Sequence, residues 1–156
     1  MSQNKFLFWL FNTKQDNLAA FLRIVIGVVI FPHGAQKLLG WFGGYGFEGT
    51  MGFFTQTLGI PYLFALLAII AEFFGGLGLI TGFLTRLSAF GVAAVMFVAV
   101  MLNHLHVGFF MNWSGQQQGE GFEYHILMIA LTIAVMVKGA GSFSFDKLIL
   151  QKISKQ

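Results

Sequence analysis

The sequence predicts an all-α integral membrane protein: a four-helix bundle with a short amphipathic helix on its outer face, between the first and second spans. Two observations support this prediction. Of the 156 residues, 56% are hydrophobic and only 10% are charged, whereas a soluble domain carries about a quarter charged residues. The apolar residues also gather in four stretches, each near the roughly 20 residues that a helix needs to cross a bilayer. The length predicts one membrane domain, residues 1–156.

The first two apolar segments lie near the start of the chain. Residues 6–11 are too short for the hydrophobic region of a signal peptide, so we expect an amphipathic stretch at the membrane surface. The first span is predicted at residues 18–39. In the connection that follows, residues 47–58 repeat large apolar side chains at helical spacing, which predicts the short outer-face helix.

The remaining spans follow in quick succession. The second is predicted at residues 61–83, and its Pro61 suits the first turn of a helix. The third, residues 85–106, follows with almost no loop, so spans two and three form a tight antiparallel hairpin. The fourth, residues 122–138, is the shortest. The amphipathic tail 142–156 alternates apolar residues with lysines, and we expect it to lie along the cytoplasmic face.

Basic residues predict the orientation of these spans. Threading the spans alternately places most of them on one side: Lys5, Lys14, Arg86, Lys138, Lys147, Lys152 and Lys155. The positive-inside rule therefore puts both termini in the cytoplasm. Because the cations are scattered singly and not clustered, they indicate a lipid bilayer as the partner and no nucleic acid.

Ionisable residues inside the spans mark the candidate site, since such residues are costly in a membrane and face the bundle interior. Arg23, His33 and Lys37 share an arc of about 80° on the first helix. Glu72 lies near the middle of the second, where it must pair with a cation or bind a proton. Its depth favours Arg23 as the partner, and His33 comes next.

Histidines extend this cluster toward the outer side. The third helix ends in His104 and His106, which point about 200° apart, and His125 lies on the fourth helix. We expect His104 and His125 to face inward. Glu120 and Glu123 turn inward only if the fourth helix begins irregularly. The outer half of the bundle then gathers His33, Lys37, His104 and His125 above Glu72.

Three interpretations of this cluster stay open. The first is a network of hydrogen bonds and ion pairs that only fixes the helix register. The second is a pocket for a quinone or a similar polar head group, because imidazole and carboxylate groups hydrogen-bond carbonyls and exchange protons. The third is a bound metal, either zinc, copper or iron on three histidines and a carboxylate, or haem between two histidines. The chain contains no cysteine, which excludes disulfides, thiolate ligands and thiol redox chemistry.

The spacing of these residues resembles the DoxX family of small membrane proteins. The residues that carry the resemblance are Arg23, Gly27, His33, Gly34, Lys37, Pro61, Glu72, Gly75, Gly76, Leu79, Gly82 and Arg86, followed after the fourth span by Gly139, Gly141, Ser144 and Asp146. Ala140 stands where the family usually has proline. The resemblance implies a four-helix protein of the bacterial inner membrane, with a link to quinone-dependent redox chemistry.

The function that follows as a hypothesis is a membrane subunit of a quinone-linked oxidoreductase or redox-stress system. Its cofactor is a quinone, with a metal left undetermined, and its partner is a redox protein or a second copy of the chain. Glu72 and His33 are the candidate catalytic residues, and the quinone-binding residues are Arg23, Lys37, His104 and His125. The alternatives are a non-catalytic accessory subunit that docks a larger complex, and a small proton-coupled transporter.

Overall fold

The computed structural model describes residues 5–154, and over that range it contains helices and turns but no β-strand. The predicted all-α class is therefore confirmed. The helices are α1 (Lys5–Phe11), α2 (Asn17–Leu39), α3 (Gly46–Gly52), α4 (Tyr62–Thr81), α5 (Thr85–Ala99), α6 (Glu123–Lys138) and α7 (Phe145–Ile153), with the short turns η1 (Trp41–Gly43), η2 (Phe53–Thr57) and η3 (Val100–His104).

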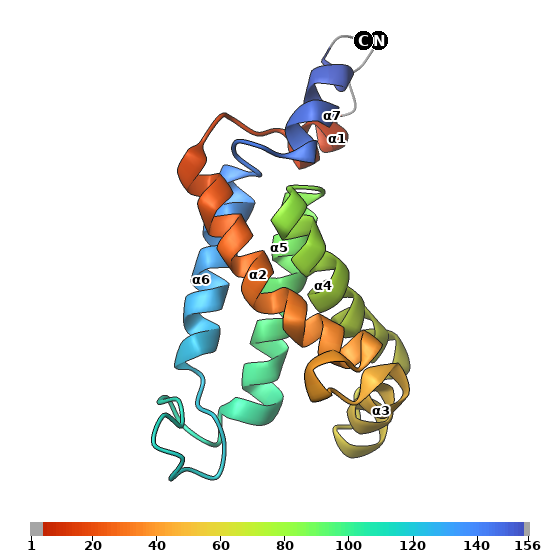
Figure 1. Ribbon diagram of the computed structural model, residues 1–156, viewed down its shortest axis with the longest axis vertical. Coiled ribbons are helices and arrows are strands. Elements are labelled where there is room, and N and C mark those ends of the chain that lie inside the picture. The colour runs from red at the N-terminus through yellow and green to blue at the C-terminus, as the bar shows by residue number, and fades with distance from the viewer. Residues whose placement is uncertain (1–4, 155–156) are drawn as a thin grey trace.

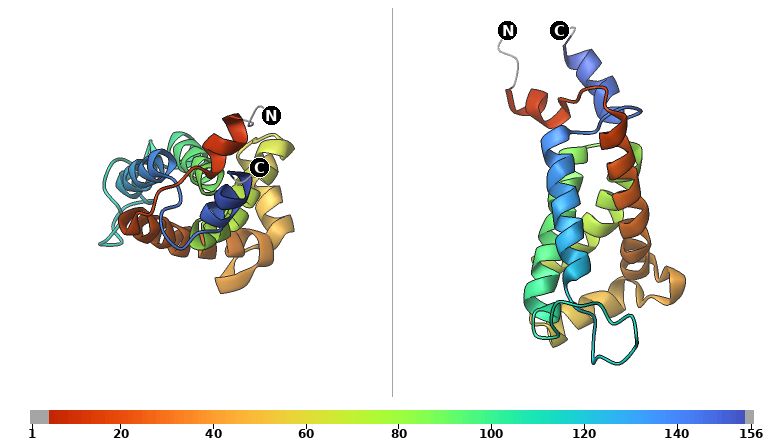
Figure 2. Two further views of the ribbon diagram at one scale, coloured as in Figure 1. Left: turned by 90° about the horizontal axis from the view of Figure 1, so that it is seen from above. Right: turned by 90° about the vertical axis from the view of Figure 1, so that its left-hand side faces the viewer.

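The long helices α2, α4, α5 and α6 run side by side along the longest axis of the molecule (Figure 1). The short helices α1 and α7 lie together at one end, here called the tail end (Figure 2). The opposite end carries α3 and the connection between η3 and α6, and is called the loop end. The tail helix α7 projects away from the bundle at this end (Figures 1 and 2). Lys155 lies outside the described residues.

Three described helical segments are long and apolar enough to cross a membrane: α2, α4 and the continuous helix Thr85–His104 that α5 forms with η3. The helix α6 has 16 residues and is shorter. All four helices nevertheless share one hydrophobic core. Its buried members are Ile26, Ile30, Leu79, Ala89, Val92, Met96, Met128 and Val135.

Glycines set the register between α2 and α4, the most closely packed pair of helices. A Cβ atom on Gly34 would collide with the backbone of Phe73, and one on Gly76 would lie 3.0 Å from Phe31. One on Gly27 would lie 2.8 Å from the backbone of Ile80. Small residues let two membrane helices approach this closely. The register places the C-terminal part of α2 beside the middle of α4, and the N-terminal part of α2 beside the end of α4.

Two arginines and one aspartate tie the tail end together. Fully buried Arg23 donates hydrogen bonds to backbone carbonyls at the end of α4 and in the segment before α7. Arg86 donates to carbonyls near the end of α6 and to Trp9 and Asn12. The carboxylate of Asp146 accepts hydrogen bonds from the backbone N–H groups at the start of α5. We call these hydrogen bonds of Arg23, Arg86 and Asp146 the arginine clamp. The sequence analysis did not predict it.

Candidate functional site

An ion pair between α2 and α4 forms the centre of the candidate site. The ammonium of Lys37 donates a hydrogen bond of 2.5 Å to Oε2 of Glu72. The Glu72 side chain is almost fully buried, whereas that of Lys37 is 26% exposed. The pair lies on the side of the glycine contacts that faces the loop end. It supplies the counter-charge that a carboxylate at this depth requires.

The expected pairing of Glu72 with Arg23 is wrong. The helix register puts Arg23 level with the end of α4, far from the middle of that helix where Glu72 lies. The Arg23 guanidinium donates instead to the carbonyl oxygens of Leu79, Ile80, Ala140, Ser142 and Phe143, at 2.6–3.1 Å. These five contacts use all five N–H donors of the guanidinium group. Arg23 therefore belongs to the arginine clamp at the tail end and is not placed to bind a ligand beside Glu72.

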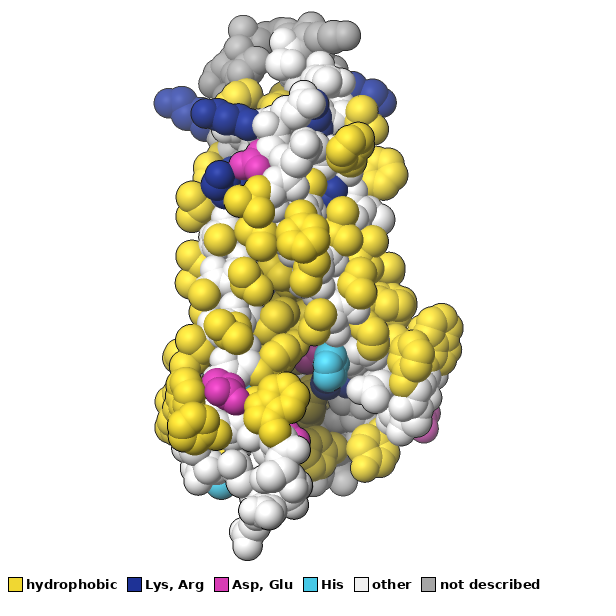
Figure 3. Space-filling model, turned by 60° about the vertical axis from the view of Figure 1, so that its left-hand side comes forward, with side chains coloured by type: hydrophobic (Ala, Val, Ile, Leu, Met, Phe, Trp, Pro, Cys, Tyr) yellow, Lys and Arg dark blue, Asp and Glu magenta, His cyan; other side chains and the backbone are white. Residues whose placement is uncertain are grey.

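His33 lies near the ion pair, on the exposed side of α2. It precedes Lys37 by four residues on the same helix, which is about one helical turn. The side chain is exposed, and no hydrogen bond joins it to Glu72 in the part of the chain that the structure describes. Figure 3 shows histidine, acidic and basic side chains gathered in a hollow on one apolar face of the bundle. His33 is therefore an exposed neighbour of the ion pair and not the partner of Glu72.

The histidines of α6 and η3 form a second group. The rings of His104 and His125 lie 4.1 Å apart between centroids, and His125 is buried while His104 is half-buried. His106 is exposed. Nδ1 of His104 lies 2.8 Å from the carbonyl oxygen of Glu120. Because a carbonyl only accepts, this nitrogen carries the proton.

Tyr124 is the residue of the site that sequence reasoning missed. Among the described residues, its buried hydroxyl has no hydrogen-bond partner, and neither does Nδ1 of its neighbour His125. The ring centroids of Tyr124 and His125 lie 5.5 Å apart. One sequence signal was available: Tyr124 precedes Met128 by four residues, which places both on the same inward stripe of the helix.

The acidic residues at the start of α6 serve the outer connection. Oε1 of Glu123 accepts hydrogen bonds from the backbone N–H of Met111 at 2.9 Å and from the Trp113 indole at 3.3 Å. Oε2 of Glu120 accepts from the backbone N–H of Asn112 at 2.8 Å. Both carboxylates therefore hold the loop in shape and do not add to the cluster around Glu72.

The arrangement of these side chains does not support the metal interpretation. Within residues 5–154, no three histidine, aspartate or glutamate side chains converge closely enough to hold an ion. The rings of His104 and His125 are in direct contact, which leaves no space for a haem macrocycle between them. The geometry offers an ion pair with a buried carboxylate, two histidines in contact, and two buried polar atoms, the Tyr124 hydroxyl and His125 Nδ1, that lack a hydrogen-bond partner within residues 5–154.

Comparison with known proteins places the chain beside other membrane proteins. The family model named DoxX matches residues 18–105. The chain is 30% identical over 118 residues to the inner membrane protein YqjF of Escherichia coli (strain K12), covering 72% of this chain and 82% of that protein. It is 27% identical over 114 residues to the "Putative oxidoreductase CatD" of Bacillus subtilis (strain 168), covering 73% and 75%. No solved structure matches.

Proposed function

The chain belongs to the DoxX family, and from that premise we propose that it is a membrane subunit of a quinone-linked oxidoreductase. The proposed site lies in the loop-end half of the bundle and holds the quinone head group. One relative, which is named as a putative oxidoreductase, supports redox chemistry. The chain has no cysteine, so we propose that a partner protein or a soluble donor exchanges electrons with the bound quinone.

The observation that carries this proposal is a pair of buried polar atoms on α6, in the same loop-end half of the bundle as the ion pair. The hydroxyl of Tyr124 and Nδ1 of His125 are buried, and neither has a hydrogen-bond partner in residues 5–154. An unpaired buried polar group is costly, and the cost is higher where hydrocarbon surrounds the bundle. A ligand with oxygen atoms removes that cost. The residues therefore fit a flat, mostly apolar head group that carries carbonyl oxygens.

The chemistry of the site follows from its groups. A bound quinone supplies carbonyl oxygens that take up electrons and protons on reduction. The Tyr124 hydroxyl would donate a hydrogen bond to one such oxygen, and His125 would contribute the second polar group. The Lys37–Glu72 pair and the exposed imidazole of His33 would supply the polar groups through which protons reach the head group.

The topology belongs to the same proposal. A helix of 16 residues, such as α6, is about 24 Å long, and the residues before it extend its apolar run toward the roughly 30 Å of a hydrocarbon core. We propose that α6 is the fourth span. The basic residues of the tail end then face the cytoplasm of a bacterial inner membrane, together with both termini.

Extraction tests this proposal most simply. The full chain is purified in detergent, its bound lipids are extracted, and the extract is searched for quinone. The proposal predicts a bound quinone, and an absorbance change of the reconstituted protein when the added quinone is reduced. Finding neither a quinone nor a quinone-dependent absorbance change would contradict it.

A second candidate function is a non-catalytic accessory subunit. The observation that favours it is that the charge of Glu72 is already balanced by Lys37, just as Arg23 and Asp146 are satisfied by hydrogen bonds within the fold. Under this alternative the polar network only holds the helices together. The substitution E72Q would then lower stability without changing any bound small molecule, and the chain would co-purify with a larger complex.

A further inference from the structure

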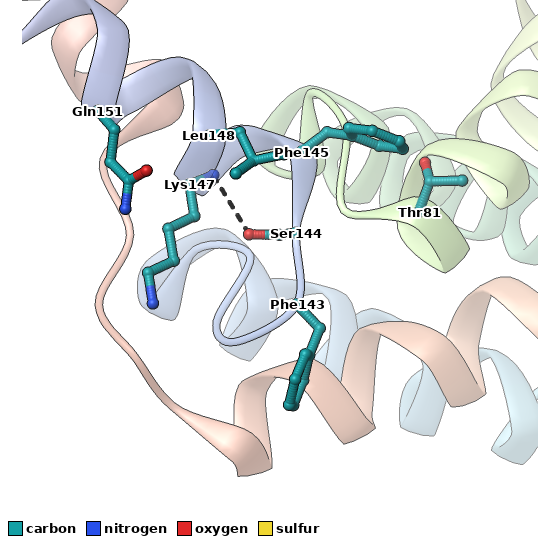
Figure 4. Close-up of a pocket in the computed structure, with 7 residues that line it drawn as sticks. All are labelled: Thr81, Phe143, Ser144, Phe145, Lys147, Leu148 and Gln151. Atoms are coloured by element: carbon teal, nitrogen blue, oxygen red, sulfur yellow. Dashed lines mark hydrogen bonds between the residues drawn. The ribbon is translucent and has the colours of Figure 1, made fainter.

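A groove at the tail end lies outside the site described above. It has a volume of about 380 Å³ and runs between the end of α4 and the first turns of α7 (Figure 4). Its walls are formed by Thr81, Phe143, Ser144, Phe145, Lys147, Leu148 and Gln151. Neither the redox proposal nor the arginine clamp explains why this surface carries such large apolar side chains.

The groove is apolar on one side and polar on the other. Figure 4 shows Lys147 and Gln151 at one end, with Phe145 and Thr81 at the other. Phe145 and Leu148 are each more than half exposed. A surface that pairs bare aromatic rings with an ammonium and an amide suits an amphiphilic occupant, because the apolar part buries the rings and the head group meets the cation.

Phe143 adds a sign that the apolar wall has a function. Its φ angle is 54°, in the left-handed region that favours glycine, and its side chain is 88% exposed. The backbone is held there because the Phe143 carbonyl accepts a 2.7 Å hydrogen bond from buried Arg23. A strained residue that the surrounding structure keeps in place is a pointer to function. Here the strain presents a large aromatic ring to the surroundings of the bundle.

Charge decides which amphiphile fits. Basic side chains gather around this end of the molecule (Figure 3). The aspartates of the same end do not offset them at the surface: Asp146 is buried against backbone N–H groups, and Asp16 is paired with Lys138 at 2.9 Å. The groove also lies where α4 ends, which is the level of the lipid head groups if α4 crosses the membrane.

We infer that this groove binds an anionic phospholipid. The phosphate lies against Lys147 and Gln151, and an acyl chain covers the rings of Phe143 and Phe145. The bound lipid thereby anchors α7 and the segment before it to the membrane. This site is independent of the quinone proposal, because the groove shares no residue with the cluster around Glu72.

Native mass spectrometry on the full chain tests the inference. Wild-type and variant proteins are reconstituted in phosphatidylcholine bilayers with and without phosphatidylglycerol. The fraction of protein that retains a bound lipid is then measured from the masses of the complexes. K147Q should retain phosphatidylglycerol about fivefold less well, because it removes the hydrogen bond that the ammonium, which lines the groove, donates to the phosphate. K152Q is the matched control on the same helix, since Lys152 does not line the groove, and it should behave as wild type.

A second variant removes the aromatic wall without imposing strain. F143G should lower retention, while glycine accepts the positive φ and keeps the fold. F42G is its control, because Phe42 has the same φ of 54° and is exposed at the opposite end of α2. Equal retention by all variants would overturn the inference. So would full competition by the deacylated head group, which would indicate a phosphate site, or occupation of the groove by a partner peptide in place of lipid.

Discussion

Nζ of Lys37 lies 2.5 Å from Oε2 of Glu72, so that the polar half of α2 is joined to the middle of α4 inside the bundle. The same two helices are held at short range by Gly27, Gly34 and Gly76. The ion pair and the glycine contacts thus depend on one register. Disturbing either should disturb the other, and both can be tested by stability measurements in detergent.

Breaking the ion pair should destabilise the protein. E72Q leaves the Lys37 ammonium without its counter-charge, and we expect a loss of about 3 kcal/mol in the free energy of unfolding. The double substitution of Lys37 by Met and Glu72 by Leu should recover most of that loss, because it removes both charges together. Denaturant unfolding followed by circular dichroism measures both. A double variant no better than E72Q would show that the pair is not what stabilises this contact.

The close contact of α2 with α4 predicts a sharp effect at Gly34. G34A places a methyl group against the backbone of Phe73, and forcing the helices apart should cost about 2 kcal/mol. Gly52 is also helical, but a Cβ atom added to it would meet no neighbour within 4 Å, so G52A should change stability by less than about 0.5 kcal/mol. Thermal unfolding of the two variants compares them directly, and equal effects would refute the register.

Much of the fold was accessible from composition and periodicity, whereas the contacts of the site were not. Long apolar runs fix which segments become helices, and the inward stripe of α6 correctly placed His125 in the interior. The partner of Glu72 was mispredicted because depth was counted along straight helices, which ignores the register that the glycines impose. The role of Arg23 was missed because its acceptors are backbone carbonyls, which have no sequence signature.

Arg23 provides a test of that corrected role. R23K keeps the charge but has too few donors for the carbonyls that Arg23 binds, so buried acceptors lose their partners. We expect a loss of about 3 kcal/mol or more in the free energy of unfolding, with unchanged quinone content in the folded fraction. Lipid extraction and denaturant unfolding give the two values. Loss of bound quinone with unchanged stability would contradict this role and would indicate that Arg23 binds the ligand.

Lowering the pH should destabilise the fold by protonating Asp16 at the tail end. Its carboxylate accepts a hydrogen bond from Ala19 N–H and pairs with Lys138, and these contacts lower its pKa below the ordinary value of 3.8. A group with a lowered pKa stabilises the fold above the unfolded-state value, and this stability is lost as the pH falls through the folded-state pKa. D16N keeps an N-cap acceptor but does not titrate. Its stability should therefore fall less than that of wild type between about pH 4 and pH 2, as measured by denaturation midpoints.

The central claim is that the unpartnered hydroxyl of Tyr124 belongs to a ligand, and one paired measurement tests it. In Y124F, a buried hydroxyl without a partner is removed, so the ligand-free protein should be as stable as wild type or more stable. The dissociation constant for a quinone should rise about fivefold, the usual effect of one lost hydrogen bond. Y62F, at the exposed start of α4, should change neither value. Unchanged quinone affinity in Y124F, or no quinone binding by the wild type, would contradict the account.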